Sequence, residues 1–137
     1  MYRKEINIVW LKRDLRLMDH EPLLKAQQEE IPFLILFCFE PSVMNYDDSD
    51  LRHWRFIMES LVEMKNRLTK YNQCIYWFHQ EAEEVFEILS KNYLIKNIYS
   101  HVEVGNNLTF QRDLKMKAFF SERNIEWKES PIHGVIR

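Results

Sequence analysis

Glycine is nearly absent from this sequence, which contains only Gly105 and Gly134 among its 137 residues. Gly-rich dinucleotide loops and P-loops each need several glycines, because these bring backbone amides against a phosphate. The scarcity of glycine therefore excludes both kinds of site. Zinc-like spacing of Cys and His is also lacking. Ser100, the only serine near a predicted strand end, lacks the small neighbours of a nucleophile elbow, so hydrolase chemistry is not expected.

Cysteine is also scarce, and neither sign of charge is in large excess. Cys38 and Cys74 each lie in an apolar run, which predicts buried, reduced thiols rather than a disulfide. The net charge of −2 leaves no readable basic face, so we do not expect the chain to bind nucleic acid on its own. No signal peptide or long apolar span is present, and we therefore expect a cytoplasmic protein with no membrane partner.

Apolar residues are plentiful, since 46% of the residues are hydrophobic and 14% are aromatic, which suits one domain with a single core. Short apolar runs alternate with helical patterns along the chain. Strands are predicted at residues 6–11, 31–39, 74–78, 97–100 and 125–128, and helices from residue 19, over 51–71, around 82–89 and over 109–123. This alternation predicts an α/β fold with a doubly wound, five-stranded parallel sheet and helices on both faces, Rossmann-like but without a Gly-rich loop.

Local signals predict the ends and the buried faces of these helices. Asp19 is predicted to cap the first helix, with Pro22 in its first turn. The acidic segment 47–50, Asp-Asp-Ser-Asp, precedes the second helix, where negative charge complements the helix dipole. The second helix is predicted to bury Trp54, Ile57, Leu61, Met64 and Leu68, and the last helix Leu114, Ala118 and Phe119 or Phe120.

Two polar clusters follow predicted strands. Residues 12–19 follow the first strand and include the charged residues Lys12, Arg13, Asp14, Arg16 and Asp19, and residues 101–107 follow the fourth strand. Open α/β sheets bind their ligands at the carboxyl ends of their strands. Both clusters are therefore candidate binding sites, although the sequence indicates neither a catalytic residue nor a metal site.

Residues 9–20, Val-Trp-Leu-Lys-Arg-Asp-Leu-Arg-Leu-Met-Asp-His, resemble the opening motif of the DNA photolyase and cryptochrome family. That motif reads apolar-Trp-Phe-basic-Arg-Asp-Leu-Arg, two variable positions, then Asp-Asn or Asp-His, and Leu11 replaces its Phe. Later segments resemble the family in the same order: 52–61, 100–106, Arg112-Asp113, 125–127 and 134–137. The resemblance therefore covers nearly the whole chain.

The resemblance implies that residues 1–129 form the N-terminal α/β domain of a flavoprotein and that residues 130–137 begin the interdomain linker. In this family a larger C-terminal helical domain binds FAD, and damaged DNA binds through that domain. That domain is outside this sequence, so we expect the chain to bind no FAD and to be inactive alone. The isolated fragment is expected to expose an apolar patch or to dimerise through it, and residues 47–50 and 130–134 are predicted border elements.

The family's α/β domain often holds an antenna pigment, a folate or a deazaflavin, in a cleft near the domain boundary. The residues predicted to contact such a pigment lie at or just after three strand ends: Arg13, Cys38, Phe39, Glu40, Glu103, Gly105 and Asn106. For Glu103, Gly105 and Asn106, ordinary loop and N-cap chemistry is an equally good explanation. For Phe39, simple core filling is the better one.

Four positions are interpreted as the family's structural signature: Trp10, Asp14, Arg16 and Asp19. An ion-pair network of Arg13, Asp14 and Arg16 that holds the first turn is favoured over direct contact with a chromophore, although the planar guanidinium group suits either role. Trp10 is predicted to be a core residue rather than an electron-transfer group.

The sequence therefore predicts the N-terminal light-harvesting or structural domain of a photolyase-type flavoprotein. The intact protein would use blue light to repair pyrimidine dimers in DNA. Three alternatives stay open: a cryptochrome-type photoreceptor domain, a stand-alone nucleotide-binding or stress-type α/β domain, and a docking domain that holds no pigment.

Overall fold

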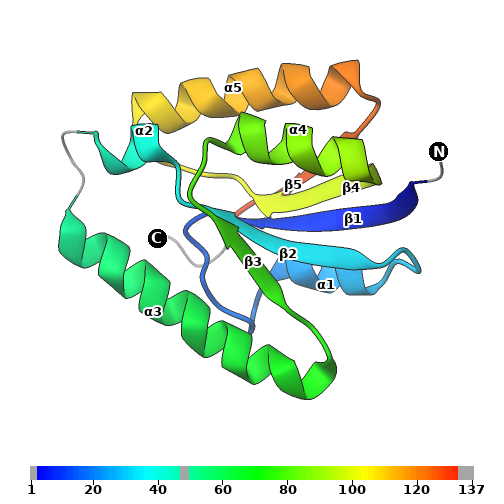
Figure 1. Cartoon of the computed structure of the whole chain (residues 1–137), viewed down its shortest axis with the longest axis horizontal. Coiled ribbons are helices and arrows are strands. Elements are labelled where there is room, and N and C mark those ends of the chain that lie inside the picture. The colour runs from blue at the N-terminus through cyan, green and yellow to red at the C-terminus, as the bar shows by residue number, and fades with distance from the viewer. Residues whose placement is uncertain (1–2, 47–49, 133–137) are drawn as a thin grey trace.

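Five parallel strands form one sheet in the part of the chain that the structure, a computed structural model, describes: residues 3–46 and 50–132. The strands are β1 (Lys4–Leu11), β2 (Phe33–Cys38), β3 (Ile75–Phe78), β4 (Tyr93–His101) and β5 (Glu126–Ser130). Their order in the sheet is β3-β2-β1-β4-β5, and every neighbouring pair is parallel (Figure 1). The predicted doubly wound α/β fold is confirmed.

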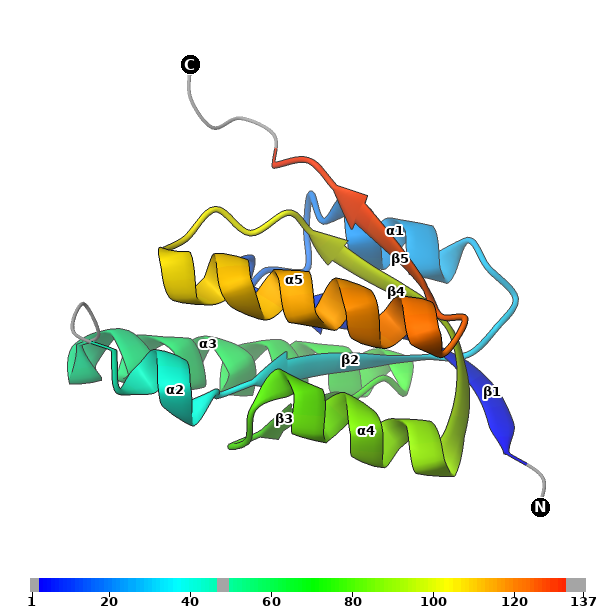
Figure 2. The ribbon, with the colours of Figure 1, turned by 90° about the horizontal axis from the view of Figure 1, so that it is seen from above.

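Helices cover both faces of the sheet. They are α1 (Glu21–Gln27), α2 (Pro41–Met44), α3 (Leu51–Leu68), α4 (Ala82–Asn92) and α5 (Asn107–Glu122), with a 3₁₀ turn at Thr69–Tyr71. Helices α4 and α5 lie side by side on one face, and α1 and α3 cover the other (Figures 1 and 2). Among the described residues, no helix has the length and apolar character needed to span a membrane.

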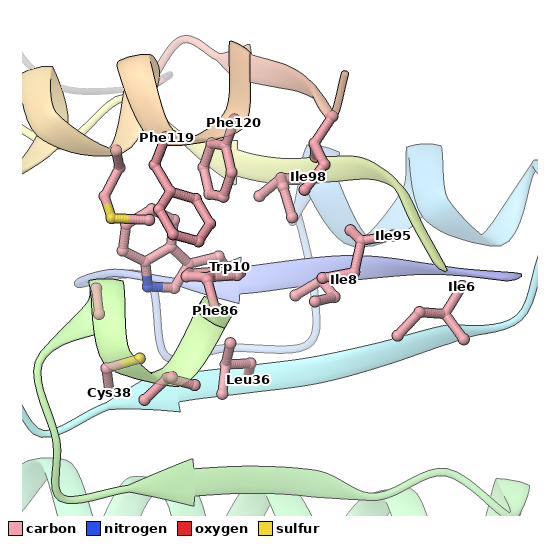
Figure 3. Packing of buried hydrophobic residues seen from close by; sticks show 14 residues of the cluster. Ile6, Ile8, Trp10, Leu36, Cys38, Phe86, Ile95, Ile98, Phe119 and Phe120 are labelled. Carbon is pink, nitrogen blue, oxygen red and sulfur yellow. The ribbon is translucent and has the colours of Figure 1, made fainter. Parts of the chain in front are cut away.

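The central strand β1 supplies side chains to the cores on both faces. Ile6, Ile8 and Trp10 point into the core beneath α4 and α5 (Figure 3), whereas Val9 and Leu11 point toward α1 and α3. This alternation follows from the two-residue period of a strand, and burial on both faces explains why β2 and the second half of β1 are entirely apolar. Because helices cover both faces of the sheet, polar groups gather at the carboxyl ends of the strands.

The N-terminus of α1 differs from the prediction. His20 is the N-cap, since its Nδ1 accepts a hydrogen bond from the backbone N–H of Leu23 at 3.1 Å. Asp19 is exposed and has a φ of 51°, which lies in the left-handed region that Asp tolerates better than most residues. Asp19 therefore turns the chain into the helix but does not cap it, and the predicted cap was one residue too early.

The negative charge predicted before the second helix is confirmed in part. Asp50 caps α3, because its Oδ1 accepts a hydrogen bond from the backbone N–H of Arg52 at 2.9 Å. The rest of the acidic segment, residues 47–49, lies outside the described residues, as do residues 133–137 of the predicted linker. Trp54 is half-buried against the core on the α3 face, and the other four predicted core residues of α3 are buried.

Two other expectations about elements were wrong. Strand β4 has nine residues instead of the four predicted, because its first part, from Tyr93, pairs with the start of β1. In α5, Leu114 and Ala118 are exposed, while Met116 is buried with both Phe119 and Phe120. The buried face of α5 is therefore formed by residues 116, 119 and 120. The helix is rotated about its own axis relative to the predicted orientation, which buried Leu114 and Ala118.

Candidate functional site

A cavity of about 240 Å³ opens at the carboxyl ends of β1, β2 and β4. We call it the strand-end cavity. It is lined by Trp10, Leu11, Lys12, Arg13, Phe37, Cys38, Glu40, Val43, His53, Trp54, Ile57, Glu103, Asn106 and Arg112. In the order β3-β2-β1-β4-β5 the strand connections reverse direction next to β1, and this switch point is where open α/β sheets place ligands.

Glu103 connects the cations of the cavity wall. Its Oε1 lies 2.6 Å from Nη2 of Arg112 and 3.5 Å from Nζ of Lys12, and its Oε2 lies 3.4 Å from Nε of Arg13. Lys12 is itself buried and pairs with Asp113 at 3.1 Å. This network holds the loop after β4 against the end of β1 and against α5.

Asn106 and Gly105 determine the structure at the N-terminus of α5. The Oδ1 of Asn106 caps the helix by accepting the backbone N–H of Thr109 at 3.0 Å. A Cβ at position 105 would lie 2.5 Å from Oγ1 of Thr109 and 3.2 Å from Nη2 of Arg13. Gly105 is therefore required for close packing, so that the loop and the guanidinium of Arg13 can lie together. The expected N-cap role of Asn106 is confirmed, and the same residue also lines the cavity.

We expect Gly105→Ala to lower the free energy of unfolding by about 1–3 kcal/mol, because the added methyl group must displace the Thr109 hydroxyl within a packed loop. Urea denaturation of the wild type and the variant measures this change. The matched control is Val104→Ala, since Val104 is exposed and its variant should stay within about 0.5 kcal/mol of the wild type. Equal stability of the two variants would contradict the packing role of Gly105.

Two groups at the end of β2 have raised pKa values. Burial raises the pKa of Glu40 to about 7, with Glu103 and Glu81 adding to the effect and Arg112 opposing it. Burial also raises the pKa of the Cys38 thiol, and the neighbouring Glu40 raises it further. Cys38 thus stays a protonated thiol near neutral pH, which suits packing and not nucleophilic attack. Both cysteines are free, as predicted, although Cys74 is only half-buried.

The cavity brings together most of the residues predicted to contact a pigment. Arg13, Cys38, Glu40, Glu103 and Asn106 all line it. Two of the residues predicted to contact a pigment do not line the cavity. Phe39 is buried in the core on the α3 face, where its ring packs 4.9 Å from that of Phe37, and Gly105 packs closely against Thr109 and Arg13.

Several residues that line the cavity were not predicted from the sequence as site residues, and the main ones are Arg112, His53 and Trp54. The first turn of α3 carries His53 and Trp54 to the end of β2, and α5 carries Arg112 to the end of β4. The sequence held one usable signal for them. A helix that follows a parallel strand through a loop starts near the carboxyl edge of the sheet, so its early polar residues are site candidates.

Asp14 forms a separate buried cluster with two histidines. Its Oδ2 lies 2.6 Å from Nε2 of His20 and 2.6 Å from Nδ1 of His101, and its Oδ1 accepts the backbone N–H of Lys12 at 2.7 Å. Burial alone would raise the pKa of Asp14. The contacts with His20, His101 and Lys12 outweigh that effect and hold the pKa well below its usual range.

The predicted ion-pair network of the first turn therefore has other partners. Arg13 contacts Glu103, while Nε of Arg16 donates to the backbone carbonyl of Asp19 at 3.3 Å. Asp14 pairs with histidines instead of arginines because the turn directs its carboxylate inward and leaves both arginine side chains exposed. Trp10 is a core residue, as predicted, and its ring also forms part of the cavity wall.

The histidine cluster has the composition of a metal site, since donor atoms of Asp14, His20 and His101 lie within 4.8 Å of one another. The hydrogen bonding of His20 argues against one. Because its Nδ1 accepts the N–H of Leu23, the neutral ring carries its proton on Nε2, where a metal would need a lone pair. Metal binding through Nε2 would therefore sacrifice the cap of α1.

Comparison with known proteins places this arrangement in a family. The family model described as DNA photolyase matches residues 7–136. The chloroplastic/mitochondrial cryptochrome DASH of Solanum lycopersicum is 27% identical over 97% of this chain and 23% of its own length. Cryptochrome DASH of Gloeobacter violaceus is 28% identical over 79% of this chain and 23% of its own length. The chain thus spans about a quarter of the length of these relatives.

Solved structures of photolyases and cryptochromes have the same fold as this chain. A Synechocystis cryptochrome has the same fold, with a TM-score of 0.83 and 22% identity over 94% of this chain and 28% of its own. An archaeal photolyase from Sulfolobus tokodaii, described with two FAD molecules and a novel light-harvesting cofactor, has a TM-score of 0.81 and 27% identity over 92% of this chain and 29% of its own. Since the family model also matches nearly all of the sequence, the chain belongs to the DNA photolyase family.

Proposed function

We propose that this chain is the light-harvesting N-terminal domain of a photolyase-type flavoprotein, and that the strand-end cavity holds its antenna pigment. The observation that carries the proposal is the convergence of five predicted contact residues on one cavity at the switch point of the sheet. The intact protein would repair pyrimidine dimers in DNA with blue light. Cryptochrome-type photoreception is the second candidate, favoured by the matches to cryptochrome DASH.

The chemistry of the cavity suits a flat heteroaromatic ring such as a folate pterin, a deazaflavin or a flavin. Among its lining residues, His53 and Trp54 supply aromatic surface, and Ile57 supplies apolar surface. Charged lining residues, chiefly Arg112 and Glu40, supply hydrogen-bond donors and acceptors. Members of the DNA photolyase family bind FAD and an antenna chromophore. The two FAD molecules of the Sulfolobus photolyase support a flavin-like antenna as one choice.

Val43→Trp is expected to weaken pigment binding by at least about tenfold, because the indole would fill space in the cavity that the ring needs. Equilibrium titration of the chain with a reduced folate, a deazaflavin and FMN, followed by pigment fluorescence, measures the dissociation constants. Glu63→Gln is the control, since Glu63 is exposed on α3, away from the cavity. If none of the three pigments binds the wild-type chain, the antenna proposal is wrong.

The chain alone should not repair dimers under blue light, since the proposal assigns the catalytic FAD and the repair reaction to the helical partner domain. Repair of dimers by the purified chain alone would overturn that assignment. The partner surface we propose includes Val102, Val104 and Ile132, which are exposed and line one shallow cavity together with Arg13. Residues 133 and 134 of the predicted border lie outside the described residues.

A further inference from the structure

Two charged side chains of the strand-end cavity have unused hydrogen-bonding capacity. Glu40 is only 5% exposed, and its Oε2 accepts the backbone N–H of Ala82 at a long 3.4 Å. Its Oε1 lies 3.5 Å from Nη1 of Arg112, which is too far for a good hydrogen bond. The Nε and Nη1 atoms of Arg112 are buried and have no hydrogen-bond partner among the described residues, although Nε lies 3.3 Å from Oδ1 of Asp113 as an ion pair.

Buried donors and acceptors in folded proteins are nearly always satisfied, so such a pair calls for an explanation. Arg112 is not loosely placed, because its Nη2 is held by Glu103 at 2.6 Å. Glu40 is fixed at the end of β2, where its backbone starts the short helix α2. The two side chains are therefore rigidly presented to the cavity, with a donor and an acceptor side by side.

An adjacent donor and acceptor complement a ligand edge with the same two functions in reverse order. A ring N–H beside a ring carbonyl, the lactam or imide edge of a pterin or flavin, has this pattern. We propose that Glu40 and Arg112 bind such an edge, with the Glu40 carboxylate accepting the ring N–H and Nη1 of Arg112 donating to the neighbouring carbonyl. This inference rests on the proposed pigment site and names the residues that select its ligand.

The proposal requires Glu40 in its ionised form, and several charged groups control that form. Arg112 on α5 favours the carboxylate, while Glu103 after β4 and Glu81 before α4 oppose it, and Cys38 on β2 is its neighbour within the strand end. With a pKa of about 7, Glu40 loses its charge as the pH falls below neutrality. Ligand affinity should therefore be highest at alkaline pH and fall about tenfold from pH 8 to pH 6.

Methylation of the ring nitrogen provides a test that needs no protein variant. We expect the chain to bind lumiflavin at least about tenfold more tightly than 3-methyllumiflavin at pH 8, and pterin more tightly than 3-methylpterin, since a methyl group removes the donated proton. The preference should shrink at pH 6. Whichever pair shows binding identifies the ring class that the cavity takes.

The protein arm of the test compares Glu40→Gln with the exposed control Glu63→Gln. Glu40→Gln should bind with no dependence on pH between 6 and 8, while Glu63→Gln should follow the wild type. Equal affinity of the wild type for methylated and unmethylated rings would overturn the assignment of Glu40 and Arg112 but leave the pigment site in place. Failure of every ring to bind would overturn the pigment site and this inference together.

Discussion

Replacing Asp14 by Asn is expected to lower the free energy of unfolding by about 3–5 kcal/mol, because the buried carboxylate accepts several hydrogen bonds and bonds to a charged group contribute about 1.5–3 kcal/mol each. The Asp14 carboxylate lies 2.6 Å from both His20 and His101, and it also accepts the backbone N–H of Lys12. An amide cannot offer the same charge to both rings. The end of β1, the start of α1 and the end of β4 all meet at this side chain, so the loss should affect the whole domain.

Urea denaturation at pH 7 measures the effect, and Arg16→Gln is the matched control. Arg16 belongs to the same motif, but its side chain is exposed, and among the described residues its hydrogen bond is to the backbone carbonyl of Asp19. We expect the control to change stability by less than about 0.5 kcal/mol. If Asp14→Asn unfolds at the same urea concentration as Arg16→Gln, the histidine cluster does not stabilise the fold.

The low pKa of Asp14 gives this prediction a pH dependence. The carboxylate is more easily ionised in the folded state than in the unfolded state, where its pKa is near 3.8. Its contribution to stability is therefore present above about pH 4 and is lost as the pH falls through the folded-state pKa. The difference in stability between the wild type and Asp14→Asn should thus narrow on acidification below pH 4.

The histidine cluster also shows why its pairing could not be predicted from the sequence. Arg13 and Arg16 flank Asp14 in the chain, so they were the obvious partners. The actual partners come from the start of α1 and from the end of β4, and only the pairing of β4 with β1 brings His101 to Asp14. Nearness in sequence predicted the charged turn, but the direction of each side chain depends on the tertiary structure.

More of the residues that line the strand-end cavity could be predicted from the sequence, because the topology of the sheet brings strand ends together. Parallel strands that are neighbours in a sheet end at the same edge, so Arg13 after β1, Glu40 after β2 and Glu103 after β4 had to come close together. Arg112 could not be found in this way, because its position depends on how α5 is rotated about its own axis.

The prediction of which face of α5 is buried was also wrong. Apolar residues occur on two stripes of this helix, one through Phe110 and Leu114 and one through Met116 and Phe120. With nearly equal apolar content on both stripes, the hydrophobic pattern alone cannot select the buried one. The core decides, since the second stripe contacts Trp10 and Phe86 on the sheet side of the helix (Figure 3).

Trp10→Ala is expected to lower the free energy of unfolding by about 3–5 kcal/mol, whereas Leu114→Ala should lower it by less than about 0.5 kcal/mol. The ring of Trp10 lies 5.0 Å from that of Phe86 and 5.5 Å from that of Trp127, so its removal opens a large cavity in the core. Nζ of Lys12 also lies 4.1 Å from the Trp10 ring and would lose that contact.

Chemical denaturation of the wild type and both variants measures these changes, and Trp10→Phe should fall between them because a smaller ring still contacts Phe86. The comparison separates two models of α5. If the stripe that contains Leu114 faced the core, Leu114→Ala would cost about 2–5 kcal/mol, like other buried leucines. A small effect of Leu114→Ala is expected when α5 packs through Met116, Phe119 and Phe120, and the large effect of Trp10→Ala shows that the same measurement detects the loss of a core side chain.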